Sequence, residues 1–339
     1  MSVRSGILSG GNWIVDKIKF IDTYPQQDAL ANISTETIGN GGSPFNVLMD
    51  LAKLQAPFPL SGVGLIGADA EGEWIRKQCQ SHQIDSSQIQ VHPTAPTSYT
   101  DVMTVRTGGR RTFFHQRGAN AYLDLENFNF SNNHSKIFHL GYLLLLDRLD
   151  LPDENYGTVA AHLLRKALEA GFQTSIDVVS EDSERFSKII TPTLPYVDYC
   201  ILNEFELGRT AGVEVRHQNK LDIEALKKAA ALILTKGIRK WLVVHFPEGA
   251  CAFGKKGEYI FQSRVKVPPA DIVSSVGAGD AFASGFLYAM HEEIAIDQAL
   301  RYAVCAAASS LYGAGASDAV LPLAEVLDLG KKFGFLEFQ

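Results

Sequence analysis

The chain has 339 residues, of which 46% are hydrophobic, and its formal net charge is −7 at pH 7. A chain of this length and apolar content can bury a large core as one domain. It has no stretch of about 18 or more consecutive apolar residues, so we expect no membrane span, and an acidic chain without a basic cluster predicts no nucleic-acid partner.

The N-terminus and the cysteines indicate the compartment. Residues 1–6 contain no apolar stretch of the kind that forms the core of a signal peptide, so we expect a cytoplasmic protein. The four cysteines are scattered and form no CxxC pair: Cys79, Cys200, Cys251 and Cys305. This pattern predicts buried free thiols in a reducing compartment, without a disulfide framework or a metal site.

The first third of the chain predicts a small separate sheet. Two stretches, 13–38 and 98–116, alternate apolar and polar residues in the way that hairpins with one buried face do. The Gly108-Gly109 pair predicts the turn of the second hairpin. We therefore expect a small β lid assembled from about residues 13–40 and 97–118.

From about residue 136 onward the pattern alternates between strands and helices, which predicts an α/β core with a mostly parallel central sheet flanked by helices. The expected strands are 7–8, 137–140, 173–179, 197–202 and 241–246. The expected helices are 159–170, 222–235, 296–312 and 321–333. No linker or repeat interrupts the pattern, so we expect a single domain over residues 1–339.

A glycine turn near the C-terminus is the strongest functional signal. Gly277, Ala278 and Gly279 are followed by Asp280 and an apolar helical stretch. Glycines let a backbone approach a ligand closely, and the amides that open a helix form a site for an anion. Asp280 would repel a phosphate bound there. It is interpreted either as a proton acceptor beside a phosphoryl group in transfer or as the cap of the helix.

Two other segments carry polar groups at the start of a helix. The pair Gly41-Gly42 precedes a helical pattern, and Asn46 faces the turn. Asn203 and Glu206 follow an apolar strand, and their spacing places an amide and a carboxylate on the same face of a first helical turn. Such a pair suits Mg²⁺ that keeps most of its water shell.

These three segments, in this order, make the chain similar to the ribokinase-like (PfkB) family of carbohydrate kinases over essentially its whole length. The resemblance implies a ribokinase-like α/β fold with a β lid. It implies an acceptor pocket lined by Asp16, Gly41, Gly42 and Asn46. It implies an Mg²⁺ and phosphate site at Asn203 and Glu206, an anion hole at Gly277, Ala278 and Gly279, and a catalytic base at Asp280. From the residues alone, Asp16 can also be a turn acid at a strand end, and Asn46 a helix cap.

The implied reaction is transfer of the γ-phosphate of ATP, assisted by Mg²⁺, to a hydroxyl of a small sugar or sugar-like acceptor. A hydroxyl is a poor nucleophile at neutral pH, and a general base beside it typically contributes ~10²–10⁴ in rate. Two alternatives stay open. One is a nucleoside kinase of the same family, with an aromatic clamp for the base from Trp13, Phe113 or Phe114. The other is a non-catalytic sugar-binding protein on a kinase scaffold.

Arg117 indicates the kind of acceptor. It lies at the end of the second lid hairpin, in a segment similar to one in ketose and keto-acid kinases of the family, where an arginine points towards the acceptor. A guanidinium suits a carboxylate or phosphate. We expect an acceptor with an anionic or keto group, or a furanose; the alternative is a solvated lid arginine. The edges of an exposed sheet pair readily, so a homodimer, if one forms, is expected through the lid.

The donor side departs from the family pattern. Ser274 stands where the resemblance implies an acid linked to a monovalent cation, and a hydroxyl cannot replace that charge, which leaves activation by K⁺ uncertain. His245 and Pro247 lie where the nucleotide phosphates are expected, and proline removes an amide donor. Nucleotide binding is predicted at His245 and Gly249, beside the Mg²⁺ and phosphate residues.

Two stretches resemble other nucleotide sites. Residues 62–67 match GxGxxG, but the next expected strand, 88–92, has no acid to bind a ribose, which argues against NAD. Residues 249–256 approach a P-loop, but Lys256 stands where Ser or Thr must bind Mg²⁺. Residues 255–258 are therefore interpreted as a turn between two strands.

Overall fold

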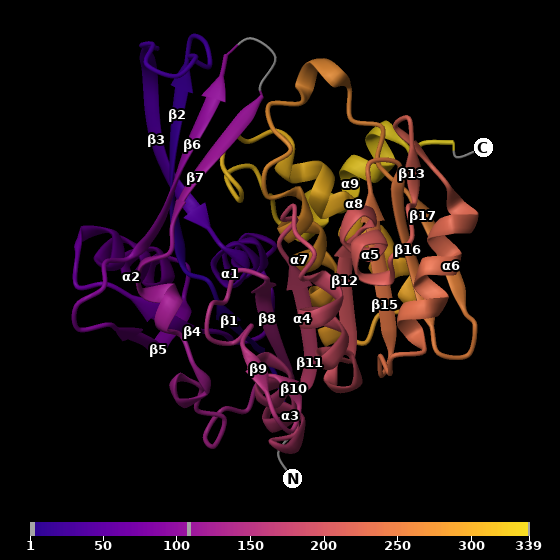
Figure 1. The fold of residues 1–339 in the computed structure, drawn as a ribbon. Coiled ribbons are helices and arrows are strands. Elements are labelled where there is room, and N and C mark those ends of the chain that lie inside the picture. The colour runs from indigo at the N-terminus through magenta and orange to yellow at the C-terminus, as the bar shows by residue number, and fades with distance from the viewer. Residues whose placement is uncertain (1–3, 107–109, 338–339) are drawn as a thin grey trace.

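The structure is a computed structural model that describes residues 4–106 and 110–337, and the predicted Gly108-Gly109 turn lies outside them. Within these residues, one large sheet has nine strands in the order β17-β16-β15-β12-β11-β8-β1-β4-β5 (Figure 1). Its neighbouring strands are parallel except at β15–β16 and β16–β17, so the predicted mostly parallel sheet is confirmed. The strands are β1 (Ile7–Gly11), β4 (Leu60–Ile66), β5 (Ile84–Val91), β8 (Ile137–Leu143), β11 (Gln173–Val178), β12 (Tyr199–Asn203), β15 (Trp241–Phe246), β16 (Gly249–Gly254) and β17 (Tyr259–Ser263).

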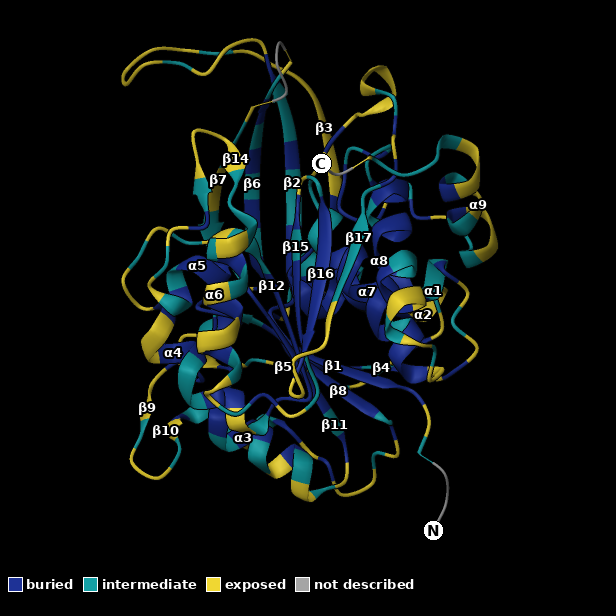
Figure 2. Cartoon of the chain, turned by 90° about the vertical axis from the view of Figure 1, so that its right-hand side faces the viewer, coloured by how far each residue is buried: buried dark blue, intermediate teal, exposed yellow. Residues whose placement is uncertain are grey.

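Helices cover both faces of this sheet (Figure 2), and apolar side chains fill the space between the sheet and the helices. One face carries α3 (Val159–Glu169), α4 (Phe186–Thr193), α5 (Glu204–Ala211) and α6 (Ile223–Leu234). The other carries α1 (Ser43–Lys53), α2 (Ala70–Ser81), α7 (Ala278–His291), α8 (Ile296–Ser310) and α9 (Leu323–Phe333). The four helices predicted from periodicity are α3, α6, α8 and α9. Two short hairpins complete the core: β9 (Pro152–Asp153) with β10 (Gly157–Thr158), and β13 (Arg216–His217) with β14 (Lys220–Leu221).

A second sheet of four strands, in the order β3-β2-β6-β7, stands beside the core (Figure 1). Its strands are β2 (Ile14–Ile21), β3 (Ile33–Gly41), β6 (Ser98–Val105) and β7 (Arg111–Gln116). The two expected hairpins, β2–β3 and β6–β7, are antiparallel, and a parallel pairing of β2 with β6 joins them. The small sheet predicted from two separated segments is therefore present.

The outer strands of this lid expose apolar side chains: Ile33, Ile38, Phe113 and Phe114. Exposed apolar edges fit the expected pairing of two lids, which stays a prediction. Across the ranges that the structure describes, no helix combines the length and the hydropathy needed to cross a membrane.

The glycines of the stretch 62–67 have a packing role. The stretch lies in β4 and its end rather than in a phosphate-binding loop. A Cβ on Gly62 or on Gly64 would lie 2.4 Å or 2.2 Å from the nearest atom of Trp13, which is fully buried. Glycine at these two positions therefore leaves space for the indole of Trp13, and their presence needs no dinucleotide to explain it.

Asp69 joins the core to the lid. It is the N-cap of α2, where its Oδ1 accepts from the amide of Gly72 at 2.9 Å. Its carboxylate also accepts from the amide of Thr97 at 2.7 Å and from the Thr97 hydroxyl at 2.5 Å, directly before β6. Burial alone would raise the pKa of Asp69. The hydrogen bonds from Thr97 and Gly72 lower it by more, so the pKa lies below its usual range.

Replacing Asp69 with alanine should lower the free energy of unfolding by about 1–3 kcal/mol, because the change removes a helix cap and leaves the donors of Thr97 unpaired. Urea denaturation at pH 7 measures the loss. Glu73→Ala is the matched control, since Glu73 is an exposed acid on the same helix, 3.9 Å from Lys77, and such a pair contributes less than about 0.5 kcal/mol. Equal losses in the two variants would contradict the role of Asp69 as a joint.

Candidate active site

Asp280 lies in the first turn of α7 with both carboxylate oxygens in hydrogen bonds. Its Oδ2 accepts from Nδ2 of Asn46 at 2.9 Å, and its Oδ1 accepts from the hydroxyl of Tyr142 at 2.6 Å. The side chain is buried. Burial and, next, the charge of Asp177 raise the pKa of Asp280 to about 7, against the effect of the two hydrogen bonds. A carboxylate with a pKa near neutrality is suited to accept a proton.

The alternative that Asp280 caps α7 is wrong. The helix begins at Ala278 with Gly277 as its N-cap residue, and no side chain caps it. Gly277 has a φ of 76°, and a Cβ there would lie 2.3 Å from the carbonyl oxygen of Ala316. This turn therefore requires glycine. It leaves the first amides of α7 at the open end of the helix, which fits the anion hole predicted at residues 277–279.

Asp16 and Gly41 meet where the lid joins the core. A Cβ on Gly41 would lie 2.4 Å from Oδ1 of Asp16, so glycine leaves room for the carboxylate. Asp16 lies within β2 and not in a turn at its end, which removes the turn-acid alternative. Burial and, next, the charge of Asp280 raise the pKa of Asp16 to about 7. The two acids are therefore close enough to influence one another.

Asn46 is oriented by a second amide. It lies inside α1 and makes no cap, so the capping alternative is wrong. Its Oδ1 accepts from Nδ2 of Asn40 at 2.7 Å, and Asn40 also donates to Oγ of Ser317 at 2.9 Å. Because the amide oxygen is engaged, the amide nitrogen faces the candidate base. Gly42, with a φ of 82°, makes the turn before α1, and a Cβ there would lie 2.0 Å from the carbonyl oxygen of Asn12.

A buried polar group that sequence reasoning missed lies behind Asp280. His139 in β8 is fully buried, with Nε2 3.0 Å from Oγ of Ser43 and Nδ1 3.0 Å from Oγ of Ser175. Ser43 donates to Oδ2 of Asp177 at 2.8 Å. The other oxygen, Oδ1 of Asp177, is buried without a hydrogen-bond partner among the described residues. His139, Ser175 and Asp177 are single polar residues inside apolar strands and form no motif, which is why the sequence pattern did not reveal this group.

Asn203 and Glu206 connect β12 to α5 through a reciprocal cap. The amide of each donates to the side chain of the other at 2.8 Å. The Asn203 side chain and the Ser180 hydroxyl also donate to Oε1 of Glu206, at 2.8 Å and 2.7 Å. Burial raises the pKa of Glu206 to about 8. Asn203 and Glu206, together with Asp177 and Asp280, line a cavity of about 110 Å³.

A neighbouring cavity of about 340 Å³ shares His245 and Gly279 with the first. Its other lining residues are mostly apolar and include Phe246, Pro247, Gly249, Val265, Phe282, Val304, Ala308 and Leu311. Such a size and lining are typical of a small-molecule site. His245 packs on the Phe282 ring with 5.0 Å between ring centroids. Burial lowers the pKa of His245 to about 4, so the neutral imidazole brings no positive charge to this cavity. A larger cavity of about 720 Å³, beside α4 and α5, contains none of the predicted residues.

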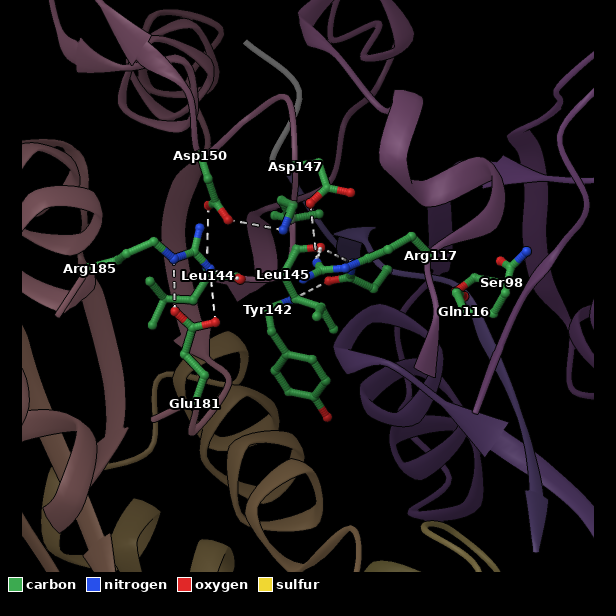
Figure 3. A network of polar contacts seen from close by, with 12 residues as sticks. Ser98, Gln116, Arg117, Tyr142, Leu144, Leu145, Asp147, Asp150, Glu181 and Arg185 are labelled. Carbon is green, nitrogen blue, oxygen red and sulfur yellow. Dashed lines mark hydrogen bonds and ion pairs between the residues drawn. The ribbon is translucent and has the colours of Figure 1, made fainter. Parts of the chain in front are cut away.

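Arg117 points to the loop that follows β8 (Figure 3). Its Nη1 donates to the carbonyl oxygen of Leu145 at 3.1 Å and lies 3.3 Å from the carboxylate of Asp147. Tyr142, whose hydroxyl contacts Asp280, extends away from this network (Figure 3). The structure thus brings Arg117 to an acid of its own chain, and its contact with an acceptor stays a prediction.

A different lid arginine lies near Asp16. Arg111 is the first residue of β7, and its charge lowers the pKa of Asp16. Its Nη2 donates to Oγ of Ser274 at 2.6 Å. The hairpin pattern could not reveal Arg111, because it does not tell which of several lid arginines turns inward.

A large mixed sheet covered by helices, a small lid and a carboxylate at a glycine turn are the parts expected of a ribokinase-like kinase. A family model described as pfkB family carbohydrate kinase matches residues 12–322. The chain therefore belongs to the pfkB family of carbohydrate kinases. It is a phosphotransferase with an alcohol group as acceptor.

Individual relatives are distant but span most of the chain. A ribokinase of Arabidopsis thaliana is 26% identical over 318 residues, which are 92% of this chain and 77% of the relative. An ATP-dependent ribose-1-phosphate kinase of Halopiger xanaduensis is 24% identical and covers 96% of this chain and 99% of its own. The solved structure of Arabidopsis thaliana ribokinase complexed with ribose and ATP, 24% identical, matches with a TM-score of 0.78 over 97% of this chain and 99% of that chain. The predicted fold is confirmed.

Replacing Glu206 with glutamine should change how stability depends on pH. The pKa of Glu206 in the folded chain, about 8, lies above that of an unfolded glutamate, about 4.3. Its favourable contribution is therefore complete below the unfolded pKa and is lost as the pH rises towards the folded pKa. Glutamine cannot ionise, so E206Q should gain stability relative to the wild type across this interval.

Urea unfolding at several pH values without Mg²⁺ measures the difference. Glu325→Gln, which changes an exposed acid in the first turn of α9, is the control and should show no such trend. A difference between E206Q and the wild type that stays constant with pH would contradict the raised pKa of Glu206.

Proposed function

We propose that the protein transfers the γ-phosphate of ATP to a hydroxyl of a small sugar or sugar-like acceptor, with Asp280 as the general base. One observation carries the proposal. Asp280 is buried in the first turn of α7, interacts electrostatically with Asp16, and shares a cavity with Glu206. The proposed proton acceptor Asp280 then lies close both to Asp16, the acid proposed to bind the acceptor hydroxyls, and to the proposed phosphate site at Glu206. The ribokinase and the ribose-1-phosphate kinase among the relatives agree with a sugar acceptor.

The reaction follows from these positions. Asp16, next to the Gly41-Gly42 turn, accepts hydrogen bonds from the acceptor hydroxyls. Asp280 removes the proton from the attacking hydroxyl while the new P–O bond forms and the bond to ADP breaks. The first-turn amides of α7 face the negative charge on the phosphoryl group, and most of the remaining catalysis is positioning.

The hydrogen bonds to Asp280 do not block this role. Each carboxylate oxygen has two lone pairs, and Tyr142 and Asn46 each occupy one oxygen with one bond. An acceptor hydroxyl can therefore bind without displacing either partner. The two donors fix the carboxylate in one orientation, and Asn46 is in that sense a positioning residue as well as a candidate contact for the acceptor.

The cavity at Glu206 suits a hydrated magnesium ion. Oδ1 of Asp177 is buried there without a partner, and Asn203 and Glu206 line the same space. In the described part of the chain no three His, Cys, Asp or Glu side chains form a direct cage, and Mg²⁺ usually keeps several of its waters. When bound, Mg²⁺ would neutralise phosphate charge. Asn203, Glu206 and Asp177 would hold its waters, and the apolar cavity at His245 and Gly249 would hold the nucleotide.

A nucleoside kinase is the second candidate, and an adenosine kinase of Schizosaccharomyces pombe, 24% identical over 70% of this chain, is among the relatives. The aromatic clamp considered for a base has less support. Trp13 is fully buried and packs on Phe45 at 5.2 Å between ring centroids, so it cannot stack on a ligand. Phe113 and Phe114 are about half-exposed on the lid. Of the three aromatic residues considered, only Trp13 is excluded by its burial. The sugar acceptor is favoured by the ribokinase and the ribose-1-phosphate kinase among the relatives.

A cytoplasmic location belongs to the same proposal. All four cysteines are buried free thiols in the structure, in agreement with the sequence-based expectation. Free thiols are typical of proteins in a reducing compartment.

Coupled ADP release with Mg²⁺ and ATP, over a panel of sugars, sugar phosphates, keto acids and nucleosides, should give turnover with a sugar-like acceptor. Asp280→Asn should lower kcat by ~10²-fold or more, because the amide cannot accept the proton. Asp297→Asn, at an exposed acid in the first turn of α8, is the control and should retain activity. Turnover with nucleosides alone, or no turnover with any sugar, sugar phosphate or keto acid, would contradict the proposed acceptor.

The pH profile should report Asp280. Since the base must be unprotonated, kcat/KM should fall as the pH falls through about 7, the pKa to which burial raises Asp280. Tyr142→Phe removes a hydrogen bond that lowers this pKa, so the acidic limb should move to higher pH. We expect kcat to fall by about tenfold in the same variant. Tyr122→Phe, at an exposed tyrosine, should change neither. An acidic limb near pH 4 in the wild type would contradict the assignment.

A further inference from the structure

Arg111 connects the lid to the two loops beside the anion hole. Its Nη2 donates to Oγ of Ser274 at 2.6 Å and to the carbonyl oxygen of Ala314 at 3.3 Å. Ser274 is buried, and its Oγ also accepts from the amide of Val276 at 2.9 Å, directly before Gly277. The guanidinium therefore reaches the anion-hole turn through one hydroxyl and the loop after α8 through one carbonyl.

Ser274 stands where the family resemblance implies an acid linked to a monovalent cation, and the residues present do not fit such a cation. A serine brings no charge, and its hydroxyl oxygen has two lone pairs, both of which already accept hydrogen bonds. The carbonyl of Ala314 also faces the guanidinium. An ion placed among these groups would lie against the positive charge of Arg111, and like charges at such a distance repel.

We propose that Arg111 takes the place of the monovalent cation, so that a lid strand supplies the fixed positive charge beside the anion hole. The inference rests on the proposed kinase function. It makes Arg111 a positioning residue: it holds the anion-hole turn through Ser274. Because Arg111 belongs to β7, the positive charge beside the anion hole is present only while β7 is docked on the core.

The charge balance of the site supports this role. The site gathers four acidic side chains around and beside the cavity at Asp280: Asp16, Asp177, Glu206 and Asp280. A bound nucleoside triphosphate adds further negative charge. Nη1 of Arg111 is enclosed and has no hydrogen-bond partner among the described residues. Water therefore has little access to this part of the guanidinium. The charge of Arg111 lowers the pKa of Asp16, which indicates that the field of the guanidinium reaches the proposed acceptor pocket.

The first experiment compares the wild-type protein in K⁺ and in tetramethylammonium chloride at equal ionic strength. Two readouts are taken: kcat with the acceptor found in the panel, and ATP affinity by titration calorimetry. Both should agree between the two salts within about twofold. An increase of about tenfold in either readout with K⁺ would overturn the inference. If no acceptor gives turnover, the proposed sugar-like acceptor fails, whereas the ATP affinities in the two salts still test the role of Arg111.

The second experiment removes the charge and returns it. Arg111→Ala should lower kcat by about tenfold or more while the KM for the acceptor changes less. Free guanidinium at a non-denaturing concentration should restore part of the loss, and Arg111→Lys should retain part of the activity. Arg110→Ala, at the exposed neighbouring arginine, is the matched control with the same change of net charge. A folded R111A protein that neither guanidinium nor K⁺ restores would show that the side chain acts only as a structural contact and would overturn the inference.

Discussion

The burial of several carboxylates at one edge of the sheet is the constraint on which the rest of the site depends. Burying a charged carboxylate in a region of low dielectric costs free energy, and each buried carboxylate raises the pKa of the neighbouring ones. Burial and the charge of a neighbouring acid raise the pKa of Asp280 and of Asp16 to about 7. Such a cluster weakens the fold unless donors surround it, and the hydrogen bonds from Tyr142, Asn46 and Ser43 supply them. The burial that costs stability also keeps the pKa of Asp280, the proposed base, near neutrality.

The lid completes this site from two directions. Strand β2 places Asp16 beside Gly41, at the proposed acceptor pocket, and strand β7 places Arg111 on Ser274, directly before the proposed anion-hole turn. Asp69 fixes the root of the lid by bonding to Thr97 at the start of β6. The acid proposed to bind the acceptor hydroxyls and the cation proposed for the phosphate side therefore belong to one four-stranded sheet.

Local signals in the sequence predicted much of the fold. Helices with a clear apolar period and strands followed by glycine turns were found close to their true bounds, and the two lid hairpins lie where alternation placed them. The parallel pairing of β2 with β6 was not predictable, because it depends on contacts between residues about 80 positions apart in the chain, such as Ile14 and Ser98. The stretch from β4 to β5 was described mainly through a false motif, since glycines that accommodate Trp13 resemble glycines that approach a phosphate.

The residues of the candidate site also fall into a group that local sequence signals mark and a group that they do not. Residues at helix starts, such as Asp280, Asn46 and Glu206, were predictable because turn chemistry and spacing mark them. Tyr142 and Arg111 were not, because a single tyrosine or arginine on a strand has no local signature and gains its meaning from what lies opposite in the fold. The family resemblance pointed to Arg117 alone, whereas the structure brings Arg111 to Ser274 and near Asp16.

The proposed catalysis depends on Asp280 being a buried base with a pKa near neutrality. Carbon-13 NMR of protein labelled at the aspartate carboxyl groups measures it directly, with the Asp280 signal identified by its absence from D280N. In the ligand-free protein we expect this signal to titrate with a midpoint near pH 7. A midpoint near 4, the ordinary value for an aspartate, would show that the carboxylate is solvated and would contradict the account of the site.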